Sequence, residues 1–217
     1  SLELARVENN VVTNKTSLPI GVLRLINNPI VKKRNLPKYV KKLLREEKWL
    51  SKKKFNNLYL VGGTWRSLFK LHLFQNNHPV HIIHQYSIDK SKLTKFVEKV
   101  SSFNKSKLKT VEYISKSRTQ FLPYSSIILN EIMTITNPKK ILCSISGLRE
   151  GSLSIDHLKN TKETEIFNKS IEYIASKRGD LGSTYQKYFK FILPVFDGNE
   201  HYNKKLLYLA CVLSHMD

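Results

Sequence analysis

The fold of this chain is constrained most strongly by two apolar, strand-like segments. Each of them is followed by glycine and then by a helical pattern. Leu58 to Val61 leads into Gly62-Gly63, and Lys140 to Ser146 leads into Gly147. Strands that alternate with helices are typical of α/β domains, in which helices cover a sheet. The 217 residues are enough to bury a core without disulfide bonds. The sequence therefore predicts a folded α/β domain.

Hydrophobic periodicity predicts the neighbouring elements. A hairpin is expected near the start of the chain, with Leu2 to Val7 as its first strand, an interruption at Asn9-Asn10, and a second extended run through Val11 to Thr13 and Ser17 to Leu25. A helix is expected from Pro37 to about Lys54, and Thr64 is expected to cap the helix after the glycine pair. The other expected elements are a strand over 84–88, helices over 89–101 and 107–114, and a helix from Pro123 that Asn137-Pro138 ends.

The hydrophobic pattern changes late in the chain, because only helical periodicity is present from about Thr161 onward. We expect an α/β domain over residues 1–158 and a short all-α segment over residues 159–217. No apolar stretch approaches the roughly 20 residues of a membrane helix, and the first residues do not resemble a signal peptide. The two cysteines, Cys143 and Cys211, do not have the spacing pattern of a disulfide-bonded domain, which is consistent with a reducing compartment. A cytoplasmic location without membrane contact is expected.

The chain is strongly basic, with 37 Lys and Arg against 17 Asp and Glu, a net charge of +20. Residues 31–56 hold eleven of these cations and residues 89–120 hold nine. Such a chain attracts polyanions, including nucleic acid without sequence preference. The alternative is compositional drift, since 29 of the 37 cations are lysine.

The glycine turn after the first strand is the leading candidate site. Backbone N–H groups of Gly62, Gly63 and Thr64 at a helix start can approach an anion closely. Arg66 lies one step into the helix, and Arg118 ends the second basic cluster. Both can clamp phosphate, although a glycine at such a turn is often only a steric requirement.

Other motifs favour structural roles. Arg149-Glu150-Gly151 lies where the next helix begins, and Arg149 and Glu150 are expected to pair with each other or to brace a neighbouring turn. His78, His81 and His84 are three apart, but Pro79 breaks a helix there and no fourth ligand is near, so a zinc site is not expected. Cys143 lies in a buried strand pattern with no partner histidine, which argues against a nucleophilic thiolate.

Five segments together resemble the Ppx/GppA phosphatase family, which comprises exopolyphosphatases and guanosine pentaphosphate phosphohydrolases. The segments are Ser1-Leu2-Glu3, residues 17–25 (SLPIGVLRL), residues 61–66 (VGGTWR), Arg118 with Leu122-Pro123, and residues 146–151 (SGLREG). They follow the family's order and cover about residues 1–155. The tail resembles the start of the helical domain of longer members.

The resemblance implies a ribonuclease-H-like fold of the actin-like superfamily, with two domains that face a cleft and this chain as the second. By position, Ser1 would contact phosphate, and Glu3 would be catalytic, holding Mg²⁺ or the attacking water. Gly62, Gly63 and Thr64 match the family's second glycine turn. The implied activity is hydrolysis of terminal phosphoanhydride bonds of inorganic polyphosphate with Mg²⁺.

Departures from the family pattern limit this expectation. The family's N-terminal domain, with its general-base glutamate and first phosphate loop, has no counterpart in this sequence. Residues 122–125 read Leu-Pro-Tyr-Ser where the family often has Leu-Pro-Ala-Gly. We therefore expect the isolated chain to be inactive without that domain, and a homodimer is an additional assembly to consider. The alternatives are a guanosine pentaphosphate (pppGpp) phosphohydrolase and, from another class, a non-catalytic polyanion-binding module.

Overall fold

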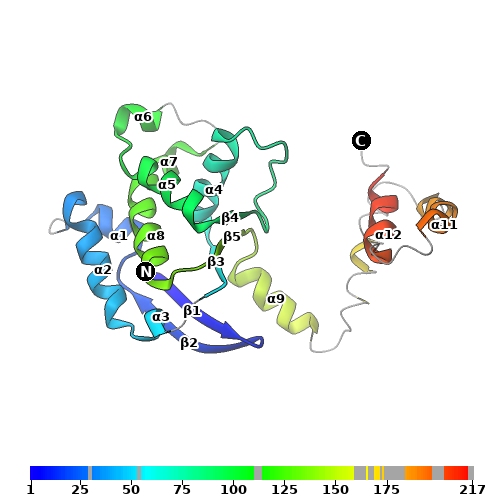
Figure 1. Ribbon diagram of the computed structural model, residues 1–217, viewed down its shortest axis with the longest axis horizontal. Helices are drawn as coiled ribbons and strands as arrows, with labels where there is room; N and C mark the ends of the chain where they lie inside the picture. The colour runs from blue at the N-terminus through cyan, green and yellow to red at the C-terminus, as the bar shows by residue number, and fades with distance from the viewer. Residues whose placement is uncertain are drawn as a thin grey trace. The chain divides into compact units, whose positions relative to one another are not determined.

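The chain divides into two units, Ser1–Gly147 and Leu148–Asp217. The computed structural model describes residues 1–28, 31–52, 55–109, 114–158, 165, 169–171, 173, 184–196 and 203–214 (Figure 1). The described elements of the first unit are β1 (Leu2–Glu8), β2 (Val11–Leu18), α1 (Val22–Ile26), the 3₁₀ turn η1 (Lys33–Asn35), α2 (Leu36–Glu46), α3 (Trp49–Lys52), β3 (Asn57–Val61), α4 (Gly63–Gln75), β4 (Ser87–Asp89), α5 (Lys90–Ser101), α6 (Lys105–Lys109), α7 (Lys116–Thr119), α8 (Leu122–Thr136) and β5 (Lys140–Ser144).

The first two strands form the expected antiparallel hairpin. β1 pairs with β2 from Leu2 opposite Leu18 to Glu8 opposite Val11. Asn9 and Asn10 make the turn with φ of 49° and 63°. Asparagine tolerates this left-handed region better than most residues, so the pair that interrupts the sequence pattern also closes the hairpin.

The expected extended run to Leu25 is wrong, because the strand ends at Leu18. Pro19 has no N–H to continue a ladder, and the chain then enters α1 after Gly21. Ile20 and Leu25 are almost fully buried. Burial of these two side chains therefore takes priority over strand propensity.

The other three strands form a mixed sheet in the order β3-β5-β4. β3 runs parallel to β5, and β4 runs antiparallel to β5. The expected strand over 84–88 begins later, because Gln85 has a φ of 60° and lies in a turn. Its N–H donates to the carbonyl of Cys143 at 2.9 Å, which positions the turn before β4 begins. The α/β class with a mixed sheet and flanking helices is confirmed.

Helix α8 is the central helix of the first unit. Leu122, Leu129 and Met133 pack into one buried cluster with α4 and α5, whereas Ile128 and Ile132 pack into a second cluster with α2 and the hairpin. Figure 1 shows α8 in green between these helices. The predicted helix from Pro123 is confirmed, and its end is fixed by Asn137, which adopts the left-handed region.

The expected helix from Pro37 to about Lys54 is interrupted. Glu47 leaves helical geometry with φ −85° and ψ 79°, so α2 ends at Glu46 and α3 begins at Trp49. The Glu47 carboxylate accepts hydrogen bonds from Thr16 Oγ1 at 2.6 Å and Trp49 Nε1 at 2.9 Å. These contacts favour the break, which periodicity alone does not show.

The described elements of the second unit are three helices, α9 (Leu148–Leu158), α11 (Thr184–Phe196) and α12 (Lys204–Leu213). Ile171, Tyr185 and Val212 form a small buried cluster there. Asn203 caps α12, because its side chain accepts from the N–H groups of Lys205 and Leu206. None of the described helices has the length and apolar composition needed to cross a membrane.

Candidate functional site

The glycine turn between β3 and α4 has an unusual backbone. Gly62 has a φ of +128°, a conformation that residues with a Cβ rarely adopt, and it immediately precedes α4. The expected cap by Thr64 is wrong, because α4 begins at Gly63 with Gly62 in the cap position, and no side chain caps it. The first N–H groups of α4 are therefore available to an anion, since an α-helix leaves its first amides without intrahelical partners.

Arg118 lies directly against this turn, although it is 55 positions after Gly63. A Cβ built on Gly63 would lie 2.9 Å from Arg118 Nη1 and 3.1 Å from its Cζ. Only glycine leaves room for the guanidinium at this distance. The two glycines thus have different roles. Gly62 allows the positive φ of the turn, and Gly63 leaves space for the Arg118 guanidinium.

Arg66 completes a basic pocket beside the turn. Its Nη1 donates to the carbonyl of Ile145 at 3.4 Å, whereas its buried Nε has no hydrogen-bond partner among the described residues. An unsatisfied buried donor costs on the order of 1–3 kcal/mol, which a bound acceptor would recover. The pocket has a volume of about 360 Å³ and is lined by Arg66, Ser67, Lys70, Ile83, Ile114, Ser115, Arg118 and Ile145.

The charged residues among the described lining of this pocket are all cations. Arg66, Lys70 and Arg118 contribute three cations, and none of the described residues that line the pocket carries a carboxylate. Among the described residues, neither arginine forms an ion pair with Asp or Glu. Paired guanidinium groups bind phosphate oxygens through two hydrogen bonds each. The arrangement therefore suits a phosphate group.

A second group of predicted residues gathers at the start of β1. Glu3 Oε1 accepts hydrogen bonds from Ser1 Oγ and from Ser17 Oγ, the latter at 2.8 Å. The hydrogen bond from Ser1, followed by that from Ser17, lowers the pKa of Glu3. The Glu3 side chain is solvent-accessible and anionic at neutral pH. A Cβ on Gly21 would lie 2.6 Å from Ser1 N, so glycine is required there.

This second group fits the ligand set of Mg²⁺. One exposed carboxylate flanked by two hydroxyl groups matches an ion that takes one or two carboxylates and keeps several waters. In the described part of the chain, no three His, Cys, Asp or Glu residues cluster to hold a metal by themselves. A cation bound through Glu3 would therefore rely on water or substrate oxygens for its other ligands.

The two groups of the first unit are separate in their polar contacts, and the remaining predicted site residues belong to the second unit. In the described residues, no hydrogen bond or ion pair links the Glu3 group to the Arg66 pocket. Arg149, Glu150 and Gly151 occupy the first turn of α9 in the second unit. Glu150 is the acidic residue of that first turn, a position that the helix dipole favours. A Cβ on Gly151 would meet nothing within 4 Å, so this glycine has no steric role.

Sequence reasoning missed several residues at these sites. Lys70 lies four positions after Arg66, so helical spacing alone could have placed it on the same face. Ser115 gave no signal, and Ser17 was noted only as part of the segment over residues 17–25, because their places beside these groups depend on packing between distant segments. Burial raises the pKa of Cys143 to about 11, and Arg66 opposes the rise only partly. The expected absence of a reactive thiolate at this position therefore has a physical basis.

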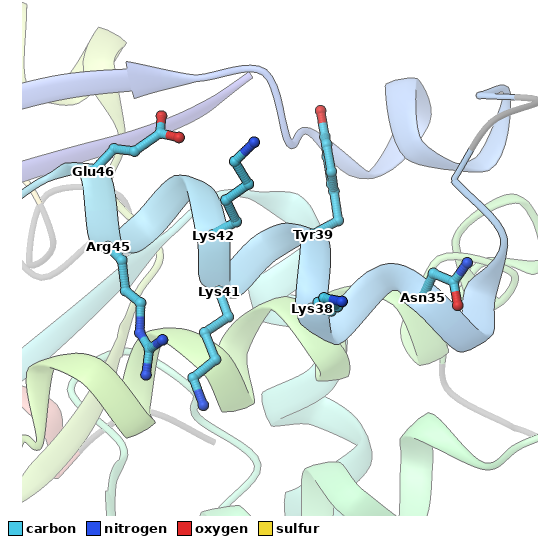
Figure 2. A pocket seen from close by; sticks show the side chains of 7 residues that line it. All are labelled: Asn35, Lys38, Tyr39, Lys41, Lys42, Arg45 and Glu46. Atoms are coloured by element: carbon cyan, nitrogen blue, oxygen red, sulfur yellow. The ribbon is translucent and has the colours of Figure 1, made fainter.

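The first basic cluster lies along α2. Figure 2 shows Lys38, Lys41, Lys42 and Arg45 projecting from this helix. They line an open depression of about 670 Å³ together with Asn35, Tyr39 and Glu46. Glu131 of α8 is close enough that Lys41 and Arg45 lower its pKa, although burial raises that pKa more. The α2 surface therefore remains strongly basic, with one partly buried acid beneath it.

The fold and these groups of residues define an α/β domain with an arginine-lined pocket beside a glycine turn. A model of the Ppx/GppA phosphatase family matches residues 1–160. The chain therefore belongs to the Ppx/GppA phosphatase family.

Solved structures agree with this assignment. A family member from Aquifex aeolicus superimposes with a TM-score of 0.58 at 22% identity, over 74% of this chain and 54% of that chain. An exopolyphosphatase from Cytophaga hutchinsonii superimposes with a TM-score of 0.63 at 16% identity, over 74% and 54%. The matched region thus spans about half of these relatives. A comparison with curated proteins gave no match.

Proposed function

We propose that this protein supplies one domain of an exopolyphosphatase that hydrolyses terminal phosphoanhydride bonds of inorganic polyphosphate with Mg²⁺. The observation that carries the proposal is the pocket of Arg66, Lys70 and Arg118 at the start of α4, whose described lining holds three cations and no carboxylate. Family membership and the likeness to an exopolyphosphatase structure support it. The domain would be the second, ribonuclease-H-like domain of the family, followed by the start of a helical domain.

In this proposal, the two arginines bind and orient phosphate oxygens. The Nε of Arg66 is already buried and needs an acceptor, and the Arg118 guanidinium lies in the space that Gly63 leaves beside the turn. Positioned cations offset the charge that develops on the transferring oxygens, which is the main contribution that a protein makes to phosphoryl transfer. Lys70, one turn further along α4, would contact the next phosphate of a chain.

Glu3 is proposed to hold Mg²⁺ or to orient the attacking water. Mg²⁺, when bound, would polarise phosphate oxygens and neutralise their charge. The lowered pKa keeps Glu3 ionised near neutral pH, as either role requires. The basic face of α2 would attract long chains toward the protein. The catalytic base belongs to a second domain in this proposal, so the isolated chain should release little phosphate.

The first test is equilibrium binding of polyphosphate of defined length, measured calorimetrically. Arg66→Gln and Arg118→Gln should each weaken binding about tenfold or more, because a charge-assisted hydrogen bond contributes about 1.5–3 kcal/mol. Arg24→Gln on the exposed face of α1 is the matched control and should change affinity little. Equal losses in all three variants would mean only nonspecific charge attraction, and the proposed site would be wrong.

The second test concerns the substrate and Glu3. Glu3→Gln should remove any increase in polyphosphate affinity that Mg²⁺ produces, while leaving binding without Mg²⁺ unchanged. Tighter binding of guanosine pentaphosphate than of polyphosphate would instead favour a nucleotide phosphohydrolase. Phosphate release by the isolated chain at the rate of a complete family member would contradict the need for a second domain.

A further inference from the structure

A small cavity adjoins the pocket of Arg66, Lys70 and Arg118, here called the arginine pocket. The cavity has a volume of about 210 Å³ and is lined by Lys70, Leu73, Phe74 and His81. Its three residues from α4 are three and four positions apart, so they share one face of the helix. Leu73 is buried in the core and gives the cavity an apolar floor. Lys70 lines both the cavity and the arginine pocket, so this lysine lies between them.

The loop after α4 forms the other wall of the cavity. The helix ends in a reversal of the Schellman type, in which the N–H of His78 donates to the carbonyl of Leu73 at 3.0 Å and Asn77 has a φ of 47°. The chain then runs back along α4. His81 therefore reaches the cavity, and Ile83 reaches the arginine pocket. The cavity and the arginine pocket thus follow one another along α4, with the cavity nearer to the end of the helix.

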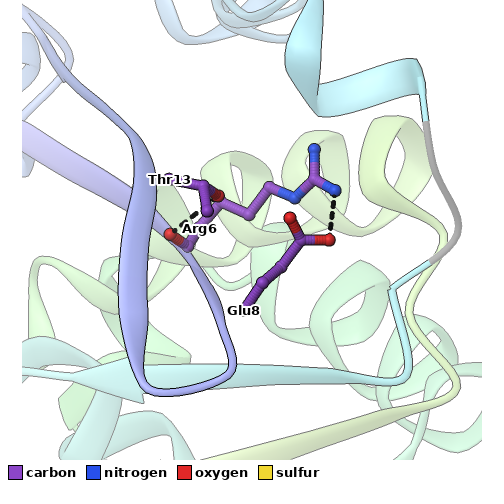
Figure 3. Close-up of polar contacts among 3 residues, drawn as sticks. All are labelled: Arg6, Glu8 and Thr13. Carbon is purple, nitrogen blue, oxygen red and sulfur yellow. Dashed lines mark hydrogen bonds and ion pairs between the residues drawn. The ribbon is translucent and has the colours of Figure 1, made fainter.

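The two polar side chains at the cavity lack partners in the described part of the chain. Neither Lys70 nor His81 forms a hydrogen bond or an ion pair with a described residue, and none of the described lining residues is acidic. The larger groove beside β1 differs, because Arg6 is paired there with Glu8 (Figure 3). A cation without an internal acid binds a ligand anion more readily. The cavity therefore favours an anionic ligand.

The size of the cavity limits the apolar part of this ligand. An apolar protein cavity of about 150 Å³ holds one benzene molecule. The cavity beside α4, at about 210 Å³, can therefore hold one aromatic ring with a small polar group, but not a nucleoside. The ring would pack against Leu73 and Phe74, where burial of apolar surface and ring contacts both contribute to binding.

The electrostatics of α4 decide the orientation of the ligand. The C-terminal end of a helix is electrically negative, so an anion is disfavoured near Phe74 and Gln75, the last residues of α4. Lys70 lies about one turn earlier, beside the arginine pocket. The charged group would therefore point toward Lys70 and the ring toward the helix end. One lysine matches a monoanion such as a carboxylate, whereas a phosphate would favour the three cations of the arginine pocket.

We propose that this cavity binds a small aromatic carboxylate, with its ring on Leu73 and Phe74 and its carboxylate on Lys70. One ammonium group cannot serve two anions fully, so this carboxylate competes with a phosphate in the arginine pocket for Lys70. Binding in the cavity would therefore weaken phosphate binding without blocking the arginine pocket. The competition rests on the proposed phosphate site, whereas the binding of the carboxylate does not.

Benzoate is the probe for the first test, and its binding to the complete chain is followed by amide chemical shifts. Benzoate should cause saturable shifts at residues 70–74 and 78–84. Benzyl alcohol, which lacks the charge, and acetate, which lacks the ring, should each bind at least about tenfold more weakly. The proposal is overturned if benzoate causes no saturable shifts in these segments, or if the three compounds bind equally well.

Substitutions then locate the bound benzoate. Lys70→Gln and Phe74→Ala should each weaken its binding about fivefold or more. Lys99→Gln, on the exposed face of α5, is the matched control and should change the affinity little. Lys70 is exposed, so Lys70→Gln decides the matter even if Phe74→Ala does not fold. If Arg118→Gln removes binding and Lys70→Gln does not, benzoate lies in the arginine pocket and the proposal is wrong.

Calorimetric titration with tripolyphosphate tests the competition for Lys70. With benzoate at about ten times its Kd, the affinity of the wild type for tripolyphosphate should fall about threefold or more, whereas the affinity of Lys70→Gln should not change. An unchanged affinity in the wild type would overturn the shared role of Lys70. If the wild type does not bind tripolyphosphate at all, the proposed phosphate site is wrong, and the benzoate shifts alone decide whether the cavity is a binding site.

Discussion

The substitution Gly63→Ala tests the central feature of the candidate site. The new Cβ would lie 2.9 Å from Arg118 Nη1 and 3.1 Å from Cζ, too close for the guanidinium to remain in place. The neighbour is the end of a flexible side chain, so Arg118 can swing away and the free energy of unfolding should change by less than about 1 kcal/mol. Loss of its charge-assisted hydrogen bond to phosphate should weaken polyphosphate binding about ten- to a hundredfold.

The neighbouring substitution Gly62→Ala is the matched control. A Cβ at this position meets only Trp65 Cδ1 at 3.7 Å, which is ordinary contact, but the φ of +128° is strained for alanine. The expected cost is about 1–3 kcal/mol of stability. At a temperature where the variant stays folded, its affinity for polyphosphate should remain close to that of the wild type.

The two measurements are urea unfolding and calorimetric titration with polyphosphate. We expect opposite profiles, with Gly62→Ala less stable but binding normally and Gly63→Ala stable but binding weakly. Wild-type affinity in Gly63→Ala would refute the role of Arg118 as an anion ligand held beside the turn. A large loss of stability in Gly63→Ala would show that the guanidinium cannot move as reasoned.

Four further predictions concern stability and reactivity. Burial lowers the pKa of His72, so the unfolded chain binds a proton at this residue more readily than the folded chain does. The free energy of unfolding should therefore be greatest above about pH 6.5 and should fall as the pH drops below that value. Urea midpoints measured against pH should fall less steeply in His72→Gln. The thiol of Cys143, with a pKa of about 11, should resist iodoacetamide at pH 8 in the native protein and react once urea unfolds it. Leu129→Ala should lower the free energy of unfolding by about 2–5 kcal/mol, because this α8 side chain is fully buried in the core. A smaller loss would mean that the core collapses around the cavity that the substitution leaves. Asn137→Ala should lower the free energy of unfolding by about 1 kcal/mol and Asn137→Gly by less, because the φ of Asn137 is +46°. Equal losses would mean that Asn137 stabilises the protein through the hydrogen bond that it accepts from Lys90.

Much of the local structure could be predicted because its signals are local. Asn9-Asn10, Gly62-Gly63 and Asn137 mark turns through their own backbone preferences, and the structure places turns or helix ends at each. The period of α8 predicted that helix correctly. Where the predictions were wrong, a distant partner was responsible: Thr16 binds Glu47 across 31 positions and favours the break between α2 and α3.

The candidate site was only partly accessible from the sequence. Gly62, Gly63, Arg66 and Arg118 each gave a signal, but nothing in the sequence placed Arg118 against Gly63 rather than in solvent. Lys70 lies on the same helical face as Arg66, so its spacing could have identified it. Ser115 could not have been found, because its position depends on how the segment before α8 packs beside α4.

The sequence by itself determined the alternation of strands and helices, the turns and the basic charge, since these follow from the chemistry of neighbouring residues. The tertiary structure alone decided which cations share a pocket and which strands pair with one another. Contacts between residues far apart in the chain depend on the packing of whole elements against one another. Backbone preference and hydrophobic period act over a few residues and carry no such information.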